Sequence, residues 1–267
     1  RKNYRLSRKR NATIVRVSDP FLNLAASFRK EAKKPAILLA SPFLMTGGAD
    51  SVFLGMAEHL TASGFDLSVV TTEPVHPNFG DNTARYEAIT KQVYHLYKFL
   101  DGKGHWKDFL DYLIESRRVD ILLLAGSATM YGLLPHLKQR FPNLKIVDHL
   151  FNEHGHIRNN RKYARFIDTH ITVNEVVKDV LIKRYGEAES KIRVIMPGVD
   201  VADSFNPDNI RKSEVVPGLE IPQGKFVVTF IGRFSEEKCP DKFVEIASML
   251  RAERGLHFMM LGDGPEY

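Results

Sequence analysis

The chain has 267 residues, of which 43% are hydrophobic and 26% are charged, and its formal net charge is +6. This composition is that of an ordinary globular protein, and the length suits one large domain or two smaller ones. The single cysteine, Cys239, excludes a disulfide framework and a cysteine-rich zinc module and indicates a reducing compartment, and no apolar run is long enough to span a membrane.

Much of the excess of positive charge lies at the start of the chain. The basic residues there are Arg1, Lys2, Arg5, Arg8, Lys9 and Arg10. No apolar segment follows them, so we predict no signal peptide. Such a run is typical of a solvated terminus, and the alternative is peripheral contact with anionic membrane lipid. We expect no nucleic-acid partner, because no motif that reads RNA or DNA accompanies it. Residues 1–35 are assigned to a basic extension.

From residue 36 onward, apolar strands alternate with amphipathic helices. The expected strands are 36–41, 66–72, 93–99, 119–125, 144–150, 169–174 and 191–196. The expected helices are 50–63, 105–117, 128–140 and 175–185, and residues 73–90 read as a polar loop. This alternation predicts an α/β fold in which a mostly parallel sheet carries helices on both faces. We assign residues 36–200 to one Rossmann-like domain.

The pattern then breaks and restarts. Residues 201–224 are rich in proline, glycine and aspartate, a composition typical of a linker. A strand at 226–231, a helix at 239–254 and a strand at 257–261 follow, which form a single βαβ unit. One such unit is too small to close a core by itself. Residues 225–267 are therefore interpreted as the start of a second domain that is incomplete in this sequence.

Gly47 and Gly48 fall in the turn between the first strand and its helix. Two glycines let the backbone approach a ligand closely, and the start of a helix favours an anion. A plain strand-to-helix turn is the alternative. The full G-x-G-x-x-G fingerprint is absent, so the sequence does not support binding of NAD or FAD.

His149 closes the apolar strand that ends near residue 150, where side chains reach the ligand-binding edge of a parallel sheet. It could act as a base or hydrogen-bond to a sugar hydroxyl. A buried structural histidine is the alternative. A loose group of possible metal ligands surrounds it, namely Asp148, His149, Glu153, His154 and His156. Their spacing matches no common zinc signature, so we predict no metal.

The strongest site signal is in the segment 226–238. Its strand runs into Gly232 and Arg233, and Lys238 follows on the same loop. A planar guanidinium and a compact ammonium at a strand end suit a diphosphate. The alternative is a charged, solvated loop. Asp263, after the last strand, either bonds its own backbone or contacts a ligand.

Together these segments resemble family-4 glycosyltransferases of the GT-B fold. The resemblance covers about residues 36–267 and rests on the glycine pair, the strand that ends in histidine, KIRVIMPGVD, FIGRFSEEK and LGDGP. It implies two Rossmann-like domains, of which the first binds the acceptor and the second a UDP- or GDP-sugar. It also implies a reaction with retention of configuration and without a metal or other cofactor, since the nucleotide sugar is a substrate.

By position, the resemblance makes Arg233 and Lys238 the pair that neutralises the donor diphosphate. Gly48 would offer backbone N–H groups to the same phosphate, and His149 would contact the donor sugar. Carbohydrate, lipid or small-molecule acceptors are all compatible. The implied location is the cytoplasm, at the inner face of a membrane if the basic extension binds lipid.

One departure from the family pattern bears on activity. Family members carry a Glu-x7-Glu motif after the GDGP segment, whereas this sequence ends at Tyr267. We therefore expect little activity from this piece alone and an active enzyme in a longer parent chain. Two other functions remain open: a non-catalytic domain that binds an acceptor or a partner, and a GT-B nucleotide-sugar epimerase.

Overall fold

The computed structural model describes residues 34–76, 79–100, 102–202, 205–209, 222–264 and 266. Two compact units make up the chain, unit 1 from Arg1 to Gly198 and unit 2 from Val199 to Tyr267, and each is described by itself. The basic run at residues 1–10, with its expected membrane contact, lies outside the described residues, as does most of the expected linker. No helix in the described ranges is both long and apolar enough to cross a membrane.

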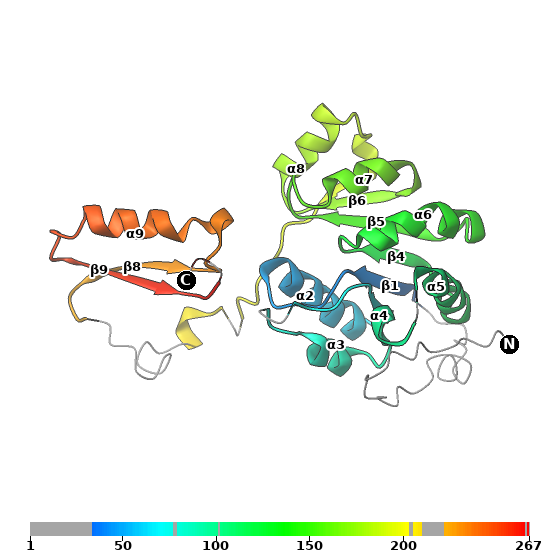
Figure 1. The fold of residues 1–267 in the computed structure, drawn as a ribbon, viewed down its shortest axis with the longest axis horizontal. Helices are drawn as coiled ribbons and strands as arrows, with labels where there is room; N and C mark the ends of the chain where they lie inside the picture. The colour runs from blue at the N-terminus through cyan, green and yellow to red at the C-terminus, as the bar shows by residue number, and fades with distance from the viewer. Residues whose placement is uncertain are drawn as a thin grey trace. The chain divides into compact units, whose positions relative to one another are not determined.

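Unit 1 is built on a seven-stranded sheet in the order β3-β2-β1-β4-β5-β6-β7, and every neighbouring pair is parallel (Figure 1). The strands are β1 (Ala36–Ser41), β2 (Asp66–Thr71), β3 (Val93–His95), β4 (Ile121–Leu124), β5 (Lys145–Leu150), β6 (Thr169–Thr172) and β7 (Ile192–Val194). The strand order reverses between β1 and β4. In open α/β sheets, ligands bind beyond the carboxyl ends of the strands at such a reversal.

Helices cover both faces of this sheet. They are α2 (Gly48–Ala62), α3 (Thr83–Ile89), α4 (Leu96–Phe99), α5 (Lys103–Arg117), α6 (Ala128–Arg140), α7 (Ile157–Tyr163) and α8 (Glu175–Asp179). Alternate residues of one strand serve the two faces: Leu38 of β1 packs in the core with α5 and α6, and Leu39 packs with α2 and α3. This burial on both sides is the reason that the strands read as continuous apolar runs.

Three predicted elements need correction. Residues 73–90 are not all loop, because α3 forms there and buries Tyr86 against the sheet. The strand predicted at 93–99 ends at His95 and continues as α4, since a short apolar run does not distinguish strand from helix by its period. The helix predicted at 175–185 is α-helical only as far as Asp179, and Val180–Arg184 forms a π-helical turn.

Unit 2 contains the predicted βαβ order. Strands β8 (Phe226–Ile231) and β9 (Leu256–Leu261) pair in parallel, and α9 (Pro240–Met249) lies between them in the chain. A cluster of aromatic rings, Phe230, Phe234, Phe243 and Phe258, joins the helix to the two strands. Large apolar side chains such as Phe226 and Met249 remain 72% and 82% exposed, as expected for one helix on a two-stranded sheet.

Candidate functional site

Every predicted site residue lies at or near the carboxyl end of a strand. In unit 1, Gly47 and Gly48 follow β1, and His149 is the second-last residue of β5. In unit 2, Gly232 and Arg233 follow β8, Lys238 ends a short 3₁₀ turn (Glu236–Lys238), and Asp263 follows β9. The structure thus gathers two groups, one on each unit. Their approach to one another across a cleft stays a prediction.

The first group contains the start of α2. Gly47 is the N-cap in an extended conformation, with φ −174° and ψ 168°, and no side chain caps the helix. Its carbonyl accepts hydrogen bonds from the amide and the hydroxyl of Ser51, each at 2.8 Å. A Cβ placed on Gly48 would meet no heavy atom within 4 Å, so Gly48 adjoins open space. An uncapped helix start beside open space is suited to an anion.

His149 is almost completely buried, with 3% of its surface exposed. Its ring packs against Phe53 of α2 and against Phe151, with centroid separations of 5.2 and 4.5 Å. Burial lowers the pKa of His149 to about 4, so the imidazole is neutral at neutral pH. Nδ1 has no hydrogen-bond partner in the described part of the chain. At neutral pH the residue therefore does not supply a positive charge.

The Asp148 side chain lies on the face of β5 opposite to that of His149. The Tyr131 hydroxyl lies 2.8 Å from each oxygen of its carboxylate, and Asn160 Nδ2 donates to it as well. Burial raises the pKa of Asp148 to about 6, against the effect of these donors. Neighbouring strand residues point to opposite faces, so Asp148 and His149 do not share ligands. No group of three possible metal ligands forms among the described residues.

This Asp148 network continues to β6 and the turn after α8. Asn160 bonds to His170 at 3.0 Å, and Glu187 pairs with both Arg161 at 2.8 Å and His170 at 3.2 Å. Sequence reasoning missed these partners. An aspartate inside an apolar parallel strand was the available signal, because a buried carboxylate needs hydrogen-bond donors.

A second missed feature lies at the reversal of strand order. Gly126, between β4 and α6, has φ +88°, and a Cβ there would come within 2.1 Å of His156 Nε2. Ser127 caps α6 by accepting from the Met130 amide, and its hydroxyl lies 2.8 Å from that of Thr72. The glycine-serine pair after a buried strand was the sequence signal for this turn. His156 is thereby placed against the turn rather than in a metal group.

In unit 2, the loops after β8 and β9 are hydrogen-bonded to each other. The amides of Gly232 and Phe234 donate to Leu261 and Asp263 at 3.0 and 2.9 Å. A Cβ on Gly262 would lie 1.9 Å from the Gly232 carbonyl oxygen, so the loops meet only because glycine is there. The Asp263 carboxylate accepts from the next amide, that of Gly264, at 2.7 Å. This is the backbone-bonding alternative considered for Asp263.

Both predicted cations lie on the loop after β8, which these hydrogen bonds hold to the loop after β9. We call it the braced loop. Arg233 is half-buried and Lys238 is exposed. The Arg233 carbonyl accepts from the Ser235 amide at 3.0 Å, and the Ser235 carbonyl accepts from the Lys238 amide at 2.8 Å. The backbone that carries the two charges is therefore held in a compact turn.

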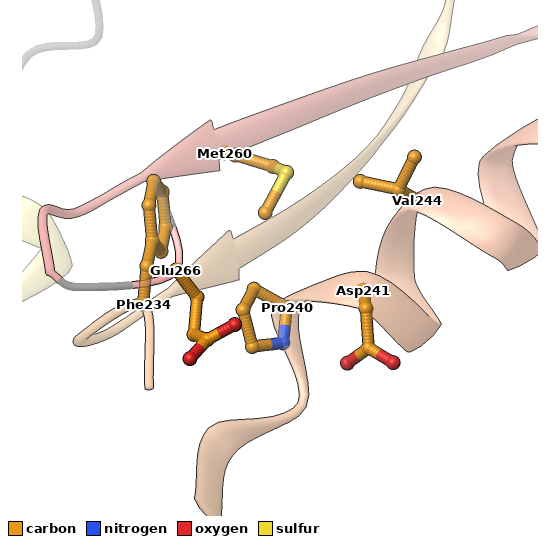
Figure 2. Close-up of a pocket in the computed structure, with 6 residues that line it drawn as sticks. All are labelled: Phe234, Pro240, Asp241, Val244, Met260 and Glu266. Carbon is orange, nitrogen blue, oxygen red and sulfur yellow. The ribbon is translucent and has the colours of Figure 1, made fainter. Parts of the chain in front are cut away.

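A pocket of about 290 Å³ lies beside this loop (Figure 2). Its lining residues are Phe234, Pro240, Asp241, Val244, Met260 and Glu266. The wall is mainly apolar and its only charges are two carboxylates, which would repel a phosphate. Neither Arg233 nor Lys238 lines it.

Comparison with known proteins identifies the family of the chain. The family model described as Glycosyltransferase Family 4 matches residues 46–203, which is more than half of the chain. A D-inositol 3-phosphate glycosyltransferase of Gordonia bronchialis is 34% identical over 83 residues, which are 31% of this chain and 18% of that protein.

Solved structures resemble the fold over most of the chain. A glycosyltransferase from Rickettsia africae superposes with a TM-score of 0.56 at 15% identity, covering 86% of this chain and 69% of that one. An α-glucosyltransferase in complex with UDP superposes with a TM-score of 0.53 at 13% identity, covering 86% of this chain and 58% of the other. The chain thus spans well under the full length of the relatives that it matches.

Proposed function

The chain belongs to glycosyltransferase family 4 and has the GT-B fold, and from this we propose that it takes part in sugar transfer from a nucleotide-sugar donor to an acceptor hydroxyl. In that reaction the bond between the sugar C1 and the diphosphate oxygen breaks, and the diphosphate keeps the electron pair. The acceptor oxygen bonds to C1 on the same face and its proton passes to the released phosphate. The donor is a UDP- or GDP-hexose, and no metal is needed.

The observation that carries this proposal is the braced loop after β8. Charge accumulates on the diphosphate as it leaves, and fixed cations lower the barrier most where charge develops. Arg233 and Lys238 supply two such charges from a backbone held by bonds to the loop after β9. In this proposal Gly48 adds backbone N–H groups to the same phosphate, and neutral His149 hydrogen-bonds to the donor sugar.

Calorimetry with UDP and GDP on the full-length protein tests the diphosphate site. Arg233→Ala and Lys238→Ala should each weaken binding by about 1.5–3 kcal/mol, the range for hydrogen bonds to charged groups. Lys242→Ala is the matched control, because Lys242 is an exposed lysine of α9 that pairs with Glu245. It should leave the affinity unchanged. Affinity that survives both test substitutions would refute the site.

Product analysis with UDP-glucose, UDP-N-acetylglucosamine and GDP-mannose separates the possible activities. Transfer releases nucleoside diphosphate together with a glycosylated acceptor, and retention is read from the anomeric configuration of the product. An epimerase would instead change the sugar without transferring it to an acceptor. Nucleotide binding without either product would favour a non-catalytic role. Anionic vesicles tested with and without residues 1–10 address the proposed membrane contact.

A further inference from the structure

We propose that Asn82 is a positioning residue that holds the Gly47–Gly48 turn in the conformation needed for phosphate binding. This inference rests on the proposed function, which makes Gly48 a phosphate contact. Asn82 itself does not touch the ligand. It acts on the three residues that precede the turn, Leu44, Met45 and Thr46.

The backbone of these three residues is bonded to the segment 80–82. The Asn82 amide donates to the Leu44 carbonyl at 2.8 Å, and Asn82 Nδ2 donates to the Met45 carbonyl at 2.8 Å. The Thr46 amide donates to the Gly80 carbonyl at 2.7 Å. Met45 and Asp81 also form an isolated antiparallel bridge. These hydrogen bonds therefore fix the backbone of residues 44–46, which immediately precede Gly47.

The Asn82 side chain bonds to the loop after β1 instead of capping its own helix. Asn82 occupies the N-cap of α3, where an asparagine side chain ordinarily accepts a hydrogen bond from its own helix, but it makes no such bond. The Asp81 carboxylate accepts from the Thr83 amide at 2.7 Å instead. Asn82 is 6% exposed, so its amide group is committed to the loop after β1 rather than to water.

Gly80 makes the close contact possible. A Cβ placed on Gly80 would lie 2.4 Å from Thr46 Oγ1 and 3.0 Å from Thr46 Cβ. Any larger residue would push the two segments apart. Gly80 and Asn82 together thus form a clamp on the loop that leads into α2.

The consequence for binding follows from preorganisation. Backbone amides bind an anion best when their orientation is set before the ligand arrives, because ordering a loop on binding costs free energy. The Gly47 turn carries no side-chain cap of its own, so its geometry depends on the preceding residues. Loss of the clamp should loosen the turn and weaken donor binding without changing the acceptor site.

The test uses two variants. Asn82→Leu keeps the size of the side chain, adds no charge and removes the hydrogen bond to Met45. Gly80→Ala places a methyl group against Thr46 and so disturbs the same loop from the segment bonded to it. In the full-length protein, hydrogen exchange of the Thr46 amide should accelerate by about tenfold in both, since its bond to Gly80 would open more often. Affinity for UDP or GDP, and the donor KM, should worsen by about tenfold while the acceptor KM stays the same.

Gln92→Ala is the matched control. Gln92 is also an amide with two side-chain hydrogen bonds, to Ser68 and Asp66, but these lie toward the amino end of β2. It should change neither Thr46 exchange nor nucleotide affinity. Unchanged Thr46 exchange in Asn82→Leu, or faster exchange with wild-type nucleotide affinity, would overturn the inference. A wild-type protein that binds neither nucleotide would instead overturn the proposed function, and the exchange data would still show whether Asn82 holds the turn.

Discussion

The imidazole of His149 meets the ring of Phe53 edge to face, with ring centroids 5.2 Å apart and planes at 85°. His149 belongs to β5 and Phe53 to α2, the helix that starts at Gly48. The His149 ring is therefore in direct contact with the helix whose first turn is the proposed phosphate contact.

The first prediction concerns acid stability. The unfolded chain protonates His149 near its ordinary pKa of 6.5, whereas burial lowers the folded pKa to about 4. Protonation therefore favours unfolding, so the stabilising effect is complete above pH 6.5 and is lost as the pH falls towards 4. His149→Gln should reduce the loss of unfolding free energy between pH 7 and pH 5 by roughly 2 kcal/mol.

Urea denaturation at several pH values measures this difference. His59→Gln serves as the control, because His59 is an exposed histidine on the same helix α2. A His149→Gln curve that runs parallel to that of the wild type would show that His149 does not titrate as proposed.

The second prediction tests whether the open start of α2 takes part in nucleotide binding. Gly48 and Gly55 both lie in α2, and a Cβ on either would meet no heavy atom within 4 Å. Alanine at Gly55 should stabilise the fold by about 0.5–1 kcal/mol, because alanine is the better helix former. Gly48→Ala should leave stability equal or higher but weaken UDP or GDP binding, because its methyl group occupies the approach to the backbone amides. Equal nucleotide affinity in the two variants would exclude Gly48 from the site.

The third prediction addresses the Asp148 network. Tyr131→Phe removes the hydroxyl that lies 2.8 Å from both carboxylate oxygens and should cost about 1–3 kcal/mol of unfolding free energy. Tyr163→Phe makes the same chemical change on a ring that stacks with Tyr131 at 6.4 Å. It should change stability by less than about 0.5 kcal/mol. Similar losses in both variants would mean that the hydroxyl bond to Asp148 is not the stabilising contact.

The fourth prediction concerns Cys239, whose φ of +52° lies in the left-handed region. Side chains with a Cβ are strained there, and glycine is not. Cys239→Gly should therefore be more stable than Cys239→Ala by about 1 kcal/mol in chemical denaturation. Both variants lose the thiol, so the comparison isolates the backbone conformation. An alanine variant as stable as the glycine variant would contradict the strain.

Some of the site was predictable because it depends on chain order. Strands of a parallel sheet all end at one edge, so residues that close an apolar strand gather there without knowledge of their contacts. This placed His149 at the end of β5 and Arg233 just after β8, and it placed Gly48 and Lys238 farther along the segments that follow β1 and β8. The conformation of the loop after β8 was harder to predict from the sequence. It depends on the close approach of Gly262, in the loop after β9, to the Gly232 carbonyl.

The sequence by itself determined the alternation of strands and helices, the parallel α/β architecture and the family resemblance, since these follow from local periodicity and short motifs. Tertiary structure alone decided that α3 forms within the expected loop, that Asp148 and His149 serve opposite faces of the sheet, and that Asn82 bonds to Met45. The reason is physical. A hydrophobic period specifies which element forms, but a buried polar group takes its partners from whichever distant segments the packing brings within hydrogen-bond reach.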